Sequence, residues 1–174
     1  MFDGNSIYLR LMEKNDCVYR TNWINDEETR RTLMFDWPLS LSGTEKWFDM
    51  QALDPKKRNF MIVSKDSNLP IGISGLIDID FRHLRGQFYM TIGEKDYWGR
   101  RIPDESIPLV LNYGFNELGL NRIYLYTLNN NERARKVYKR NGFINEGILR
   151  KHYFCVGEYQ DLQVMSILKD DFKV

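Results

Sequence analysis

The chain has 174 residues with 43% hydrophobic and 28% charged side chains, the composition of one globular domain with a core of its own. Its net charge of +1 argues against nucleic-acid binding, and no apolar run reaches the roughly 18 residues of a membrane span. The beginning of the chain lacks the profile of a secretory signal, and Cys17 and Cys155 lie far apart without metal-ligand spacing. We therefore expect a single domain over residues 1–174, in the cytoplasm, with free thiols, no bound metal and neither nucleic acid nor membrane as a partner.

The first third of the chain is predicted to form a strand followed by short helices. Ile7–Met12 alternates apolar and polar side chains, as a half-buried strand does. Helices are expected over Cys17–Ile24 and Glu27–Leu33, and an aromatic, proline-containing loop follows them. Ser42 is expected to begin another helix, with Glu45 completing a capping box.

The middle of the chain is predicted to hold consecutive strands joined by short turns. They cover Asn59–Ser64, Ile71–Ile79 and Gln87–Ile92. Strands joined by tight turns pair antiparallel. Gly72 and Gly75 inside the second of these strands indicate a bulge or the close approach of another backbone.

The last third is predicted to add a strand, a helix and a closing hairpin. Arg122–Leu128 alternates like a strand, and one of the three asparagines 129–131 is expected to cap a helix over Glu132–Arg140. Phe143–Tyr153 and Tyr159–Leu168 form the expected hairpin. Because Arg122–Leu128 comes after a helix, it should pair parallel to the strand before that helix. The result is a mixed sheet with helices on both faces.

A basic, glycine-containing loop lies between the two strands that should pair in parallel. Gly93 opens a turn after the first of them, and the segment Tyr97–Arg101 leads into a helix. The helix is indicated by apolar residues at helical spacing: Ile107, Val110, Leu111, Phe115 and Leu118. The first turn of a helix offers free N–H groups and a positive dipole end, to which two arginines add charge. This order predicts a phosphate or pyrophosphate site; an ordinary connection with solvated arginines is the alternative.

Two motifs in this part of the chain resemble those of the GNAT superfamily of N-acetyltransferases. Asn129–Phe143 reads NNNERARKVYKRNGF, similar to the family's Tyr-x-(Lys/Arg)-x-Gly-Phe motif after an Asn-led helix. Tyr97–Glu105 reads YWGRRIPDE, where the family's cofactor loop commonly reads Tyr-Trp-Gly-Lys-Gly-x-Gly-Thr-Glu. Further matches at Tyr8–Leu11 and Gly157–Asp161 extend the resemblance over almost the whole chain. It is nearest to the branch with ribosomal-protein alanine, spermidine and amino-sugar acetyltransferases.

The resemblance implies both a fold and a co-substrate. The fold is an α/β fold of GNAT type: a central mixed, mostly antiparallel sheet with helices on both faces and a splay between its two central parallel strands. The co-substrate is acetyl-CoA, whose thioester would lie in the splay. Its pantetheine arm and carbonyl would bind backbone N–H groups of Met90, Thr91 and Ile92. Its pyrophosphate would lie on Trp98, Gly99, Arg100, Arg101, Ile102, Pro103 and Asp104.

The same resemblance implies roles for two residues of the later motif. Tyr138 would contact the cofactor and act as general acid for the departing thiolate, since an unperturbed phenol titrates near 10, close to a thiol. The alternative is a tyrosine that only packs on its helix. Asn131 would hold the pantetheine arm, with helix capping as the alternative.

The general base is left open by the sequence. Gln87 occupies the catalytic position at which relatives often carry Glu, and an amide cannot accept a proton at neutral pH. Asp78 and Asp80 on the preceding strand are the substitutes, acting directly or through water. An amine that arrives partly neutral would need no dedicated base. Asp78, Asp80 and Trp37 are predicted to line the acceptor pocket; for Trp37, a place in the core is the alternative.

The cofactor loop departs from the family pattern at two positions. Arg101 and Pro103 stand where relatives have glycines, and Pro103 removes one N–H donor. Losing a donor costs on the order of 1–3 kcal/mol. Pro108 lies where it would interrupt the helix, so we expect the helix to begin late, with Asp104 or Glu105 as its cap, or to be kinked.

These observations favour an N-acetyltransferase that moves an acetyl group from acetyl-CoA to a primary amine by direct transfer in a ternary complex. The alternative is a catalytically weak or inactive binding module of the same fold, with an altered pyrophosphate loop. The acceptor, a small molecule or a peptide, is open among protein N-termini, polyamines and amino sugars. A homodimer is also left open.

Overall fold

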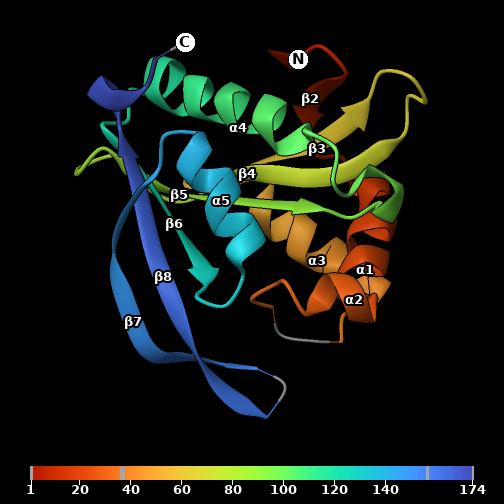
Figure 1. Cartoon of the computed structure of the whole chain (residues 1–174). Coiled ribbons are helices and arrows are strands. Elements are labelled where there is room, and N and C mark those ends of the chain that lie inside the picture. Colours follow the sequence, from red (N-terminus) through yellow and green to blue (C-terminus); the bar gives the residue numbers. More distant parts are fainter. Residues whose placement is uncertain (1, 36–37, 156, 174) are drawn as a thin grey trace.

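A mixed eight-stranded sheet runs through the molecule in the order β1-β2-β3-β4-β5-β6-β8-β7 (Figure 1). The computed structural model describes residues 2–35, 38–155 and 157–173. The strands are β1 (Phe2–Asp3), β2 (Ile7–Leu11), β3 (Arg58–Ser64), β4 (Pro70–Asp80), β5 (Arg85–Ile92), β6 (Arg122–Leu128), β7 (Ile144–Cys155) and β8 (Glu158–Leu168). These neighbours pair antiparallel, except that β5 and β6 pair parallel, so the expected mixed, mostly antiparallel sheet is confirmed.

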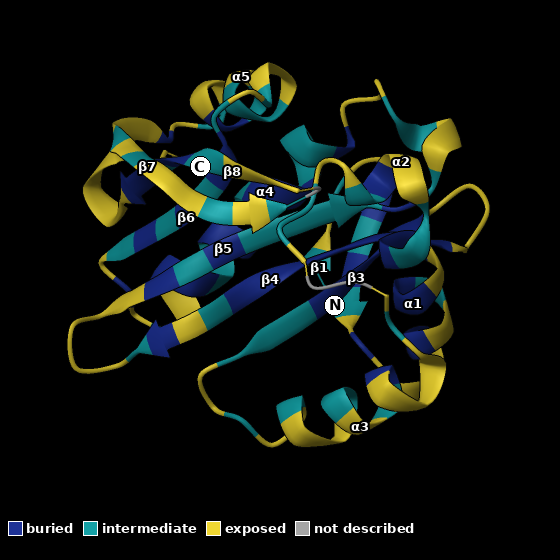
Figure 2. Ribbon diagram, turned by 90° about the horizontal axis from the view of Figure 1, so that it is seen from below, coloured by how far each residue is buried: buried dark blue, intermediate teal, exposed yellow. Residues whose placement is uncertain are grey.

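Helices cover both faces of the sheet, as the sequence predicts. They are α1 (Cys17–Asn25), α2 (Glu27–Arg30), α3 (Leu41–Gln51), α4 (Ile102–Asn112) and α5 (Glu132–Arg140). Helices α4 and α5 lie on one face, and α1 and α3 lie on the other (Figures 1 and 2). None of the described helices is long and apolar enough to cross a membrane.

Each face of the sheet has its own apolar core. Ile107 of α4 and Phe143 pack with Phe88 of β5 on the α4–α5 face. On the α1–α3 face, Trp23 of α1 belongs to a second cluster, against which Tyr89 of β5 packs. Phe88 and Tyr89 are successive residues of one strand, so the pleat turns them to opposite faces. Strand β5 therefore lies in the middle of both cores.

Two glycines of β4 allow close strand packing. A Cβ on Gly75 would lie 2.0 Å from the Arg58 carbonyl oxygen, and one on Gly72 would lie 2.4 Å from the Thr91 carbonyl oxygen. The predicted close approach is confirmed. The register with β3 also shifts beside Gly72, where Ile62 opposes Gly72 and Val63 opposes Pro70, so the expected bulge is present as well. A second bulge lies further along β4, between Ile77 and Asp80, where the register with β5 shifts.

Helix α3 begins earlier than predicted. Ser40 is its N-cap, and its hydroxyl accepts a hydrogen bond from the Gly43 N–H at 3.0 Å. The prediction that Ser42 starts the helix with Glu45 in a capping box is therefore wrong. A serine lies at each position, and the sequence pattern alone did not distinguish the two caps.

Helix α4 also begins early, and the predicted late start is wrong. Arg101 is the N-cap and Ile102 is the first helical residue. Pro103 lies in the first turn, where N–H groups have no partner within the helix, so the proline costs the helix no hydrogen bond. Pro108 lies inside the helix. There it removes one N–H donor, while the apolar face of α4 on either side of it is buried in the core.

The two acidic residues at the start of α4 bind other parts of the chain. The Asp104 carboxylate accepts hydrogen bonds from Arg140 Nε at 2.6 Å and Asn141 Nδ2 at 2.9 Å. Glu105 accepts from the backbone N–H of Ser6 at 2.8 Å and from its hydroxyl at 2.7 Å. Neither is the helix cap, because the helix begins at Ile102 and both lie inside its first turn.

Candidate active site

Strands β5 and β6 separate and open a cleft through the sheet. Their parallel pairing covers three positions, from Arg85 opposite Arg122 to Gln87 opposite Tyr124. Beyond Gln87, β5 remains paired with β4 as far as Ile92. The cleft has a volume of about 440 Å³ and is lined by residues of β5, β6, α1, α3 and α5. It therefore connects the α4–α5 face with the α1–α3 face.

The far half of β5 offers backbone donors to this opening. Gly93 donates its N–H to the Ile71 carbonyl at 2.9 Å and thus points toward β4. Alternation along the strand then turns the N–H groups of Met90 and Ile92 toward β6, and that of Thr91 toward β4. The Ile92 carbonyl accepts a hydrogen bond from Trp98 Nε1 at 2.9 Å, in agreement with this orientation.

Tyr138 lies at the cleft on α5. Its side chain is 9% exposed, and its ring packs on Phe88 and Phe143 with centroids 6.3 and 5.8 Å apart. Within the described residues its hydroxyl has no hydrogen-bond partner. Burial raises the pKa of Tyr138 to about 12. The phenol is therefore protonated at neutral pH and can donate a hydrogen bond, but it cannot act as a base.

Asn131 both caps α5 and lines the cleft. Its Oδ1 accepts a hydrogen bond from the Ala134 N–H at 3.1 Å, which fixes the start of the helix that carries Tyr138. The capping alternative is thus observed. Because Oδ1 is occupied, the side-chain amide nitrogen is the group left for the pantetheine arm.

The structure separates the two aspartates that the sequence left open. Asp78 lines the cleft from the bulge in β4, with a φ of 49°, as does Gln87 from β5. Asp80 does not line it. Its carboxylate accepts hydrogen bonds from the His83 and Arg82 backbones, both at 3.0 Å, and these bonds lower its pKa. Asp80 is therefore the last residue of β4, where its carboxylate fixes the turn to β5, and it does not belong to the cleft lining that contains Tyr138.

The loop before α4 has the geometry of an anion site. Gly99 has a φ of 83°, which glycine adopts without strain. The Arg100 guanidinium stacks on the Tyr97 ring at 4.6 Å, and Arg101 is exposed at the N-terminus of α4. Pro103 occupies one of the positions whose N–H would be free. The loop thus keeps the helix end and both charges while lacking one donor.

The wall on the α1–α3 face contains residues that the sequence analysis missed. Arg20 of α1 lines the cleft, with its Cζ 3.9 Å from the Trp47 ring centroid and 4.8 Å from that of Phe35. Tyr89 of β5 lies near it, and burial raises the pKa of this phenol. The signal for Arg20 was its position, three residues after Cys17 on the buried side of a helix. The predicted pocket residue Trp37 lies outside the described residues.

A sheet opened between two parallel strands, with a basic helix N-terminus on one side and a buried tyrosine beside it, defines an acyl-CoA-dependent transferase. The family model "Acetyltransferase (GNAT) domain" matches residues 6–144, and the chain belongs to this family. It is an N-acetyltransferase with acetyl-CoA as its co-substrate. The binding-module alternative is not favoured.

Similar proteins include polyamine acetyltransferases. The chain is 29% identical to the spermidine N(1)-acetyltransferase of Vibrio cholerae, over 97% of this chain and 96% of that protein. It is 27% identical to the Escherichia coli K12 enzyme of the same name, over 99% and 91%. The crystal structure of the Vibrio cholerae spermidine N-acetyltransferase in complex with CoA and spermine superposes with a TM-score of 0.91 at 27% identity, covering 97% and 98% of the two chains.

Proposed function

We propose that this N-acetyltransferase transfers the acetyl group directly from acetyl-CoA to the primary amine of a small molecule, with both substrates bound at once. The observation that carries the proposal is the cleft, which joins the two faces of the sheet between β5 and β6. An acyl donor on the α4–α5 face and an amine on the α1–α3 face would meet there without a covalent enzyme intermediate. The polyamine named with a related structure supports a small-molecule amine as acceptor.

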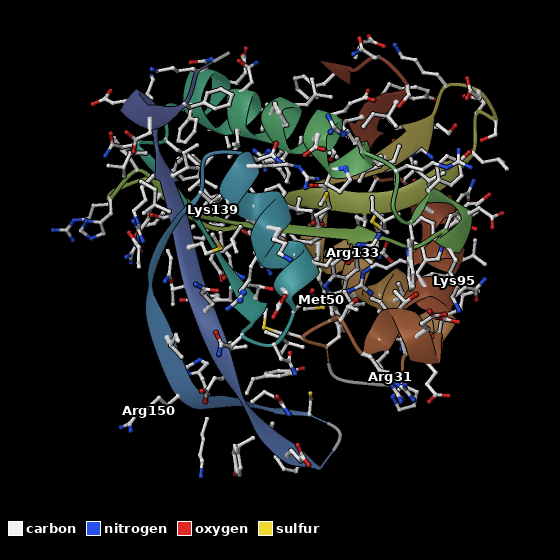
Figure 3. The ribbon with its side chains drawn as sticks, viewed as in Figure 1. Arg31, Met50, Lys95, Arg133, Lys139 and Arg150 are labelled. Carbon is white, nitrogen blue, oxygen red and sulfur yellow. The ribbon has the colours of Figure 1, made fainter. Side chains whose placement is uncertain are left out.

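The residues on the α4–α5 face fit a CoA thioester. The N–H groups of Met90 and Ile92 point into the splay, where they would bind the pantetheine arm and polarise the thioester carbonyl. The N-terminus of α4, with Arg100 and Arg101, would bind the pyrophosphate. Arg133 lines the cleft from one end of α5, whereas Lys139 lies at the other end (Figure 3).

Tyr138 would stabilise the departing thiolate. A thiol titrates near 8.5, so full proton transfer from a phenol of pKa about 12 is uphill by roughly 5 kcal/mol. Burial in the same cleft would also raise the pKa of the CoA thiol, and this reduces the pKa difference between the phenol and the thiol. Tyr138 therefore donates a hydrogen bond first and transfers its proton late.

Deprotonation of the amine falls to Asp78 or to water. Asp78 is the only carboxylate among the described residues that line the cleft. Gln87 can hold the amine or a water but cannot take its proton. A cytoplasmic location and a homodimer stay predictions of the sequence.

The test is a thiol-release assay with acetyl-CoA and a panel of primary amines, combined with thermal shift by CoA. We expect CoA to raise the melting temperature, and at least one amine to release free thiol. If neither effect is seen at millimolar ligand, the transferase proposal is rejected in favour of the catalytically inactive binding module.

A further inference from the structure

The acceptor side of the cleft contains a buried guanidinium without a protein counter-charge among the described residues. Arg20 is 5% exposed and lines the cleft. Its guanidinium stacks on the faces of the Trp47 and Phe35 rings, and the neutral phenol of Tyr89 lies near it. No ion pair or hydrogen bond joins it to another described residue.

Other buried or half-buried arginines of this protein are paired. Arg10 forms a two-pronged bond with Asp16, with N–O distances of 2.6 and 2.7 Å. Arg122 likewise binds Glu146 through two nitrogens. Arg58 instead donates to the Tyr113 hydroxyl and to a backbone carbonyl, and Arg135 donates to Asn129. Among the described residues, Arg20 has neither kind of partner.

Burial of the Arg20 charge is unfavourable in the free protein. Desolvation lowers the pKa of its guanidinium below the ordinary value. Stacking on aromatic rings offsets only part of the cost of removing such a charge from water. A guanidinium stacked in this way still presents its edge N–H groups, whose spacing matches the two oxygens of a carboxylate.

The charges around the cleft are those of a site for an anion. Its described lining includes three cationic side chains, Arg20, Lys57 and Arg133, and the single carboxylate of Asp78. Lys57 is also paired with Asp54 at 3.6 Å. Arg133 lies on α5, on the donor face, so among the described residues the unpaired cation on the acceptor side is Arg20. A polyamine would have to be placed beside this cation, whereas an acceptor with a carboxylate would neutralise it.

We propose that the acceptor is an amine that also carries a carboxylate, and that Arg20 binds this carboxylate edge-on and so orients the amine toward the splay. The inference rests on the proposed transferase function and narrows its substrate class. Arg20 then acts as a specificity-determining residue. It has no part in the proton transfers.

The experiment compares free amino acids with their amides, and both with spermidine, in the thiol-release assay. Removing the carboxylate leaves an amine that is neutral more often and hence intrinsically more reactive, so a preference for the acid must come from the protein. For the wild type we expect kcat/KM to be roughly 10- to 100-fold higher for the acid of a preferred pair, the effect of a charged hydrogen-bond pair. Spermidine should react more weakly than that acid.

The variants Arg20→Gln and Arg20→Lys test the residue itself. Arg20→Gln should raise KM for the acid by roughly 10- to 100-fold while leaving the KM for acetyl-CoA and the rate with the amide almost unchanged. The KM of Arg20→Lys for the acid should lie between those of the wild type and Arg20→Gln, because lysine keeps the charge but cannot bind both carboxylate oxygens as a guanidinium does. The control is Arg31→Gln, the same charge change at an exposed arginine paired with Glu27, which lies at the outer edge of the α2 region (Figure 3); it should match the wild type.

Each outcome decides between the possibilities. Equal use of acids, amides and spermidine by the wild type would overturn the inference even if Arg20→Gln failed to fold, and so would a uniform loss of kcat in Arg20→Gln. If no amine turns over but CoA binds, N-acetylated amino acids should raise the melting temperature of the CoA complex more than their amides do; no difference overturns the inference. Absence of both CoA binding and turnover would instead reject the transferase function.

Discussion

Replacing Tyr138 with Phe tests the proposed acid directly, because it removes only a hydroxyl. The side chain is 9% exposed, and its ring contacts with Phe88 and Phe143 do not involve the oxygen. Since the hydroxyl has no partner among the described residues, the free energy of unfolding at pH 7 should change by less than about 1 kcal/mol. General acid catalysis contributes roughly 10²- to 10⁴-fold. We expect kcat to fall by a factor in that range, with the Kd for CoA nearly unchanged.

The same variant has a second signature at alkaline pH. The pKa of Tyr138 is raised to about 12 in the folded protein, whereas an unfolded tyrosine titrates near 10. Deprotonation therefore favours the unfolded chain, so the stability that this group contributes is complete below pH 10 and is lost as the pH rises toward 12. The wild type should therefore lose up to roughly 2–3 kcal/mol of its free energy of unfolding between pH 10 and pH 12, and Tyr138→Phe should not show this loss.

The assay is thiol release under saturating acetyl-CoA, with CoA affinity measured by calorimetry and stability by urea unfolding at pH 7 and above pH 10. Tyr126→Phe is the matched control, because Tyr126 of β6 lines the same cleft and the change is chemically identical. It should keep wild-type kcat. If Tyr138→Phe also keeps wild-type kcat, or if both variants lose activity equally, the thiolate is protonated by another group or by water.

Further predictions concern the loop, the base and the sheet. Pro103→Gly should tighten CoA binding modestly in calorimetry because it restores an N–H to the first turn of α4, whereas Arg101→Gly should weaken it through the lost charge; no gain from Pro103→Gly would mean that the loop is built around proline. Asp78→Asn should lower kcat/KM most strongly below the pKa of the amine, while Asp80→Asn should leave turnover intact; the reverse order in a pH–rate series would exclude Asp78. Gly75→Ala should destabilise the protein by about 1–3 kcal/mol in urea unfolding, because the new methyl group meets a β3 carbonyl; unchanged stability would show that β3 and β4 can separate.

The sheet could be predicted from the sequence because its signal is local. Alternation in Gln87–Ile92 and Arg122–Leu128 gives both central strands, and the intervening helix requires them to be parallel. The cap at Asn131 and the left-handed glycine Gly142, with a φ of 90°, are likewise fixed by short-range chemistry. The placement of Tyr138 follows from these helix ends.

What the sequence did not predict depends on contacts between distant segments. Asp104 and Glu105, which the sequence offered as caps of α4, instead bind partners that lie 36 and 99 residues away in the chain. The bulge that places Asp78 at the cleft is a matter of register between β4 and β5. Neither is visible in a local pattern, because a carboxylate near a helix start satisfies the capping preference whether or not it caps.

The two sides of the cleft therefore differ in what can be inferred about them. The donor side is built from one stretch of chain, β5 through α5, whose motifs resemble a family that uses one co-substrate. The acceptor side is assembled from α1, α3, β3 and the opposite face of β5, and its chemistry depends on which side chains these separate elements bring together. Arg20 is an unremarkable helix residue until α3 places Trp47 against it. A relative's polyamine cannot be carried over to this wall by overall similarity, because among the described residues the wall presents the unpaired guanidinium of Arg20 as well as the carboxylate of Asp78.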